Sequence, residues 1–159
     1  MKKIKILSII VLVLVALVSN AQKNRYIKTD TYEGVIFAKY FLPNAEIAKH
    51  PFIPTDREIA TMEKKITDSI AGIFSIFVKN SFYKGNCDFA NNLKYYKRQY
   101  YGYKKKGEKV INVFFFRKVE KDWKEVMLPP ESGGCDQFRI EYAIKSGKLY
   151  NFDTDFSPE

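Results

Sequence analysis

The chain has 159 residues, of which 27 are basic and 18 acidic, with two cysteines and one histidine. A single histidine excludes a metal site built on two histidines. No repeat, low-complexity run or composition shift marks a second domain. We therefore expect one domain without a metal or a cofactor.

The N-terminus has the pattern of a signal peptide. Lys2, Lys3 and Lys5 precede an apolar run over residues 6–18. Ser19 and Ala21 then place small side chains at the −3 and −1 positions of a cleavage site. The alternative is a membrane anchor, but a span needs roughly 20 apolar residues. We predict cleavage after Ala21 and export to the periplasm or the medium. The domain then comprises residues 22–159 and keeps a net charge of +6.

The first part of this domain predicts little regular structure. Residues 22–30 are polar and are expected to be loose, as termini often are. Residues 32–42 are rich in β-branched and aromatic side chains and end before Pro43, which predicts a strand.

The organising element is a helix predicted over residues 55–79. Thr55 and Glu58 have the spacing of a capping box. One apolar stripe follows at helical spacing, formed by Ile59, Met62, Ile66, Ile70, Ile73 and Phe77.

The rest of the chain predicts strands over residues 93–103, 110–119, 123–128, 137–145 and 149–156. Short links between strands favour antiparallel neighbours. The fold class is therefore α+β, with one long helix packed on a curved antiparallel sheet of four to six strands. This order is similar to the cystatin-like and NTF2-like folds.

The two cysteines, Cys87 and Cys135, form an even pair in a chain expected to be exported, which favours a disulfide. It would close a loop of about 49 residues and stabilise the fold by about 4 kcal/mol. The alternative is two free thiols, and the absence of a CxxC motif speaks against redox catalysis.

Several short strings carry a family resemblance: residues 53–59, residues 98–103, Gly133-Gly134-Cys135 before Phe138, and residues 148–152. With them the chain resembles a group of uncharacterised small exported bacterial proteins. The final strand of that group tends to end in Asn-Gly-Glu, whereas here residues 153–156 read Asp-Thr-Asp-Phe. The resemblance implies the fold and supplies no activity.

Charge is distributed unevenly along the chain. Residues 94–124 carry a net charge of +8, and residues 125–159 a net charge of −4. A basic surface interleaved with aromatic side chains can bind a polyanion. The candidate binding residues are Tyr96, Arg98, Tyr100, Lys104, Lys105 and Lys106.

The partners that suit an exported protein are an anionic glycan, a membrane surface or an acidic protein, and nucleic acid does not suit that compartment. The competing interpretation is structural: the lysines form a solvated turn, and the tyrosines pack on the helix.

No catalytic constellation is found. His50 is the one candidate general base, and it has no nucleophile motif beside it. Asp153 and Asp155 alternate on the last strand, but a solubilising edge explains them as well as a cation site does. We therefore favour a non-catalytic binding module over an enzyme.

Two alternatives stay open. One is a small-molecule or enzymatic pocket between helix and sheet, lined by tyrosines and Trp123. The other is a cystatin-like protease inhibitor with a wedge of turns at residues 129–134.

Overall fold

The computed structural model of the chain describes residues 23–38, 50–80, 86–128 and 134–154. The predicted signal peptide lies outside these ranges, as do Asp155 and most of the turn at residues 129–134. Within the described ranges no helix has the length and apolar character needed to cross a membrane.

Helix α2 spans Asp56–Asn80, which confirms the long helix predicted from the sequence. Its first turn is closed by the predicted capping box. The amide of Glu58 donates to the Thr55 hydroxyl over 3.2 Å, and the amide of Thr55 donates to the Glu58 carboxylate over 2.8 Å. The apolar stripe is confirmed by the four fully buried side chains Ile59, Met62, Ile66 and Ile70.

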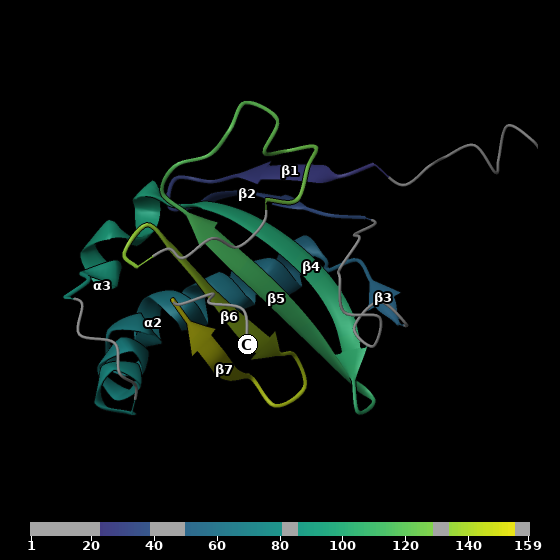
Figure 1. The fold of residues 1–159 in the computed structure, drawn as a ribbon. Helices are drawn as coiled ribbons and strands as arrows, with labels where there is room; N and C mark the ends of the chain where they lie inside the picture. The colour runs from purple at the N-terminus through teal and green to yellow at the C-terminus, as the bar shows by residue number, and fades with distance from the viewer. Residues whose placement is uncertain (1–22, 39–49, 81–85, 129–133, 155–159) are drawn as a thin grey trace, which may run out of the picture.

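In the part of the chain that the structure describes, seven strands form one open, mostly antiparallel sheet, and α2 crosses behind it (Figure 1). The strands are β1 (Arg25–Lys28), β2 (Glu33–Ile36), β3 (Pro51–Phe52), β4 (Lys97–Lys105), β5 (Glu108–Phe116), β6 (Gln137–Ala143) and β7 (Lys148–Asp153). Their order across the sheet is β1-β2-β4-β5-β6-β7, and β3 pairs with β4 as well.

Strands β4, β5, β6 and β7 are successive antiparallel neighbours, as predicted. Short turns join β4 to β5 and β6 to β7, whereas the longer segment 117–136 joins β5 to β6. The pair β2–β4 is parallel. The chain passes through α2 between these two strands, and a long crossover of this kind returns it to the same end of the sheet. The prediction of a wholly antiparallel sheet of four to six strands is therefore wrong in this pair and in the strand number.

The prediction that residues 22–30 are loose is wrong for Arg25–Lys28, which form strand β1. Strand β1 pairs with β2 along its whole length, and the turn between them is closed by the Thr29 amide, which donates to the Tyr32 carbonyl over 2.9 Å. Tyr26 adds a side-chain hydrogen bond to Glu33 over 2.7 Å. These pairings order a segment whose composition is polar.

The strand predicted over residues 123–128 is also wrong. The amides of Glu125 and Val126 donate to the Asp122 carbonyl over 2.8 and 3.0 Å, which makes a turn. The buried Gln99 side chain then holds the segment: its amide donates to the Trp123 and Val126 carbonyls, and its carbonyl accepts from the Leu128 amide. A side chain thus supplies bonds that a neighbouring strand would otherwise make.

Two short helices precede β4, and the second takes the place of the first residues of the strand predicted from residue 93. They are α3 (Phe89–Asn92) and the 3₁₀-helix η2 (Leu93–Tyr95). Asp88 caps α3, because its carboxylate accepts a hydrogen bond from the Asn91 amide over 3.1 Å. This local bond favours helix before the alternation of β4 begins.

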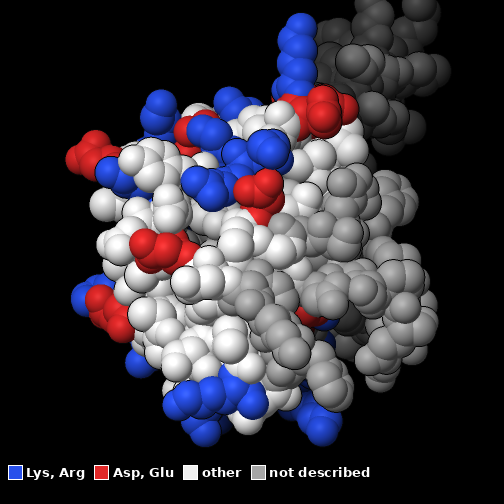
Figure 2. Space-filling view, turned by 60° about the vertical axis from the view of Figure 1, so that its left-hand side comes forward, with Lys and Arg blue, Asp and Glu red and all other residues white. Residues whose placement is uncertain are grey.

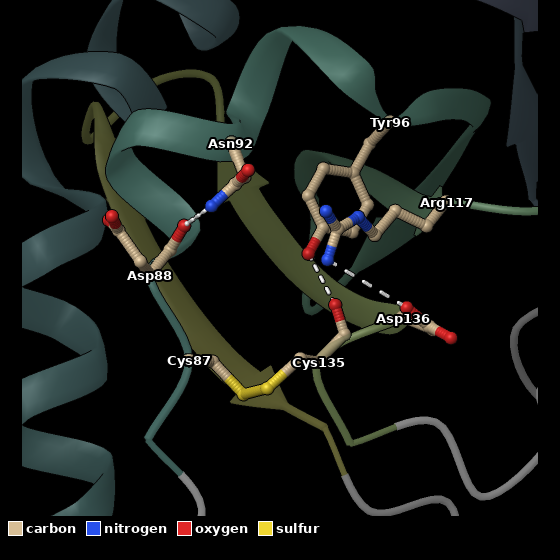
Figure 3. Close-up of a disulfide and its surroundings, with 7 residues drawn as sticks. All are labelled: Cys87, Asp88, Asn92, Tyr96, Arg117, Cys135 and Asp136. Carbon is tan, nitrogen blue, oxygen red and sulfur yellow. Dashed lines mark hydrogen bonds and ion pairs between the residues drawn. A yellow bond between two sulfur atoms is a disulfide. The ribbon is translucent and has the colours of Figure 1, made fainter.

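The predicted disulfide is present, with the Cys87 and Cys135 Cα atoms 5.3 Å apart. Figure 3 shows that it joins the segment before α3 to the segment before β6. The Tyr96 hydroxyl donates a hydrogen bond to the Cys135 carbonyl, and Arg117 lies 4.0 Å from Asp136 close by. The bridge therefore fixes one end of the sheet to the short helices.

Candidate functional site

Three of the predicted binding residues lie inside the protein. Tyr96, Arg98 and Tyr100 are all buried. Arg98 and Tyr100 alternate on β4 and point to the face that α2 covers, since both contact Glu63 of that helix. They form part of the core and present no surface to a large partner.

A buried charge cluster joins β4 to α2. Arg98 is 1% exposed and Glu63 is 4% exposed, and the Arg98 Nε atom lies 3.3 Å from Glu63 Oε1. The Tyr100 hydroxyl donates to the same oxygen over 2.8 Å. Burial raises the pKa of Glu63, while Arg98 and Tyr100 favour its charged form.

Aromatic rings enclose the guanidinium group of Arg98. Its Cζ atom lies 5.2 Å from the ring centre of Phe115 and 5.8 Å from that of Tyr32. Its Nη1 atom donates to the Tyr96 carbonyl over 2.6 Å. Arg98 is thus paired, stacked and hydrogen-bonded, as a buried cation must be.

A hollow of about 510 Å³ opens beside this cluster, and we call it the flank hollow. It lies between α2, the β1–β2 turn and the two short helices. Its lining residues are Asp30, Thr31, Tyr32, Ala60, Glu63, Lys64, Thr67, Asp68, Ala90, Asn91, Leu93 and Lys94. On α2, the lining residues are centred about a third of a turn from the buried stripe, so the hollow lies at the side of the helix.

The space directly beneath α2 is occupied by core side chains, among them Met62, Ile66, Phe115 and Phe138. Trp123 packs with Val35 and Phe37 in a separate cluster. Trp123 therefore does not line the flank hollow, although the alternative hypothesis of a pocket between helix and sheet named it as a lining residue together with tyrosines.

The three predicted lysines, Lys104, Lys105 and Lys106, are exposed at the β4–β5 turn, away from the buried residues of β4. Lys105 and Lys106 line a second hollow of about 460 Å³ together with Lys148 of β7. The Ser146 amide donates to Glu108 over 3.0 Å and ties the β6–β7 turn to the β4–β5 turn.

We call the surface formed by these two turns the lysine-rich end; its lysines are Lys104, Lys105, Lys106, Lys109, Lys145 and Lys148. Basic side chains gather at the lower end of the molecule in Figure 2, where both turns lie in Figure 1. Lys105 pairs with Glu141 over 3.6 Å and Lys109 with Glu58 over 3.7 Å. The other four have no ion pair among the described residues.

The sequence did not predict a cluster of polar side chains around Glu141, on the sheet face away from α2. Glu141 is buried, accepts a hydrogen bond from the Asn151 side chain over 3.1 Å, and pairs with Lys105. Burial and this carboxylate raise the pKa of Tyr103 and of Tyr150. Both phenols therefore stay protonated at neutral pH.

The remaining candidates are not drawn together. His50 is exposed, and its carbonyl accepts a backbone hydrogen bond from Lys104 over 3.0 Å. Asp153 pairs with Arg139 over 3.1 Å. Among the described residues, no group of three acidic, histidine or cysteine side chains is placed to hold a metal ion.

No protein-family model, curated protein or solved structure matches this chain.

Proposed function

We propose that the protein is an exported, non-catalytic binding module whose lysine-rich end contacts an anionic glycan. One observation carries this proposal: Lys105, Lys106 and Lys148, from two separate turns, line one hollow. Most basic residues in proteins lie scattered over a solvated surface. Convergence on a concave surface concentrates positive potential where a carboxylate or sulfate group can enter.

The shape of this end favours a glycan over a lipid surface. The half-buried Tyr150 side chain forms part of the wall, and Lys105 Nζ lies 5.6 Å from its ring centre. An aromatic wall beside basic groups suits a sugar ring that carries an acid. The large exposed apolar side chains of the described residues, such as Ile76 and Val126, lie on other elements and offer this end no means of inserting into a bilayer.

Export rests on the proposed signal peptide, residues 1–21, with cleavage after Ala21. The disulfide between Cys87 and Cys135 agrees with an oxidising compartment. A long helix on a mostly antiparallel sheet agrees with a cystatin-like or NTF2-like fold, and with membership of the uncharacterised exported group that the sequence resembles.

The test compares two doubly substituted variants of equal charge change. K106E/K148E reverses two lysines of the hollow, whereas K65E/K121E reverses two exposed lysines that have no ion pair among the described residues. Retention on immobilised alginate, a polyuronate, is measured against salt. We expect K106E/K148E to elute at much lower salt than the wild type, and K65E/K121E to lose only the smaller effect of net charge.

If both variants elute at the same salt concentration, retention depends only on the net charge of the protein, and the proposal is contradicted. If the protein binds phosphatidylglycerol vesicles but is not retained on alginate, the partner of the lysine-rich end is a membrane surface and the glycan proposal is wrong.

A further inference from the structure

We infer that the flank hollow is a second binding site, for a small neutral polyhydroxylated ligand of mono- or disaccharide size, in which Glu63 Oε2 accepts a hydrogen bond from a ligand hydroxyl. The hollow shares no lining residue with the lysine-rich end. The inference is therefore independent of the proposed function.

The first argument is a carboxylate oxygen that has no donor among the described residues, on an otherwise buried side chain. Glu63 is 4% exposed, and Oε1 takes both the Tyr100 hydrogen bond and the Arg98 ion pair. Among the described residues nothing donates to Oε2, and Glu63 lines the hollow. Glu63 Oε2 is not one of the buried side-chain atoms that lack a partner, so it still reaches solvent on the side of the hollow, where a ligand hydroxyl can replace water as the donor.

The second argument concerns charge. Three carboxylates, of Asp30, Glu63 and Asp68, line the hollow together with the two ammonium groups of Lys64 and Lys94. Arg98 lies directly behind Glu63 and balances the set. Lys64 and Asp68 pair with each other over 2.8 Å. A wall rich in hydrogen-bonding groups but without net charge favours a neutral polar ligand over an ion.

The third argument is size and composition. A hollow of about 510 Å³ lies within the usual range for small-molecule sites, ~300–1,000 Å³. Tyr32 and Leu93 give it apolar contact area, and the side chains of Thr31 and Asn91 add polar groups. Such a mixture matches the alternating C–H and O–H surface of a sugar.

The test uses the full exported domain, residues 22–159, and a named panel: glucose, galactose, N-acetylglucosamine and maltose, with glucosamine and glucuronate as charged counterparts. Binding is followed by saturation-transfer NMR and by backbone amide shifts, at sugar concentrations up to about 10 mM, above the ~1 mM dissociation constant of a weak site. We expect a neutral sugar to bind and to shift amides of residues 30–32, 60–68 and 90–94.

Variants locate the site. Ala60→Phe fills the hollow without touching the buried ion pair, and Ala71→Phe places the same side chain on an exposed position of α2 outside the hollow. We expect Ala60→Phe to weaken binding at least about tenfold and Ala71→Phe to leave it unchanged. Glu63→Gln turns the acceptor into a donor and should weaken binding similarly. If Glu63→Gln fails to fold, the Ala60→Phe result decides.

Three results would overturn the inference: no neutral sugar binds the wild type, Ala60→Phe binds as well as Ala71→Phe does, or only a charged counterpart binds.

Discussion

The hydroxyl of Tyr100 donates a hydrogen bond to Glu63 Oε1 over 2.8 Å, and this bond joins the central strand β4 to helix α2 inside the core. Both side chains are almost inaccessible to water. Because burial removed the water that would solvate the Glu63 carboxylate, Tyr100 and Arg98 supply its stabilisation. The stability of the helix–sheet contact should therefore depend on these two residues.

Tyr100→Phe keeps the ring and removes the donor. We expect a loss of about 1.5–3 kcal/mol in the free energy of unfolding, the range for a hydrogen bond to a charged group. Urea unfolding followed by circular dichroism measures it. Tyr95→Phe is the control because Tyr95 is exposed, and it should change stability by less than about 0.5 kcal/mol. An equal effect of the two changes would contradict this account.

Arg98→Met should destabilise the protein by about 3–5 kcal/mol at neutral pH, because it leaves a buried carboxylate without a cation. The loss should depend on pH. Burial already raises the pKa of Glu63, and removing Arg98 raises it further. A folded-state pKa above the unfolded-state value contributes stability below the unfolded-state pKa, and that stability is lost as pH rises.

The deficit of Arg98→Met against the wild type should therefore grow as the pH rises above about 4.5, the ordinary pKa of a glutamate side chain. Urea titrations at a series of pH values measure it. In the double variant Glu63→Met/Arg98→Met, which has no titratable group at position 63, the growth of the deficit with rising pH should disappear. Parallel stability curves for wild type and Arg98→Met would show that Glu63 is not the titrating group.

The disulfide should carry a large share of the stability. Its cysteines are separated by 48 residues, and a loop of that length corresponds to about 4 kcal/mol of chain entropy. We expect Cys87→Ala/Cys135→Ala to lose about that amount in urea unfolding. Dithiothreitol should lower the wild type to the same level and leave the double variant unaffected. A loss below about 1 kcal/mol would show that the sheet and α2 suffice alone.

Gln99→Leu should release residues 123–128 from the sheet. The leucine fills a similar volume but satisfies neither the Trp123 and Val126 carbonyls nor the Leu128 amide. With three backbone groups losing their partner, we expect a loss of about 3 kcal/mol or more. Hydrogen exchange at the Leu128 amide should accelerate far more than at amides of β5, and uniform acceleration would indicate global unfolding instead.

Features set by local spacing were predictable. Thr55 and Glu58 are three residues apart, and their capping bonds need nothing from elsewhere in the chain. The apolar stripe that follows is equally local. The cysteine pairing followed because only one intramolecular pairing was available.

Features set by distant partners were not. Arg98 stands between Tyr96 and Tyr100, so alternation alone could have placed it on the same buried face. Its acceptor is on another element, and the sequence gives no sign that Glu63, at the border of the helical stripe, is buried. The binding surface predicted from the sequence therefore combined residues that lie in two different places, some in the core and the others at the exposed β4–β5 turn.

The parallel pairing of β2 with β4 has a consequence for the order of events during synthesis. Lys97 of β4 meets Glu33 of β2, 64 residues earlier in the chain. The β1–β2 hairpin leaves the ribosome before α2 and β4, and it has no further strand to join until they have followed. A nascent chain that stalls before β4 therefore exposes the β1–β2 hairpin with the β4-pairing edge of β2 uncovered. We expect a chaperone or a protease to act on this hairpin.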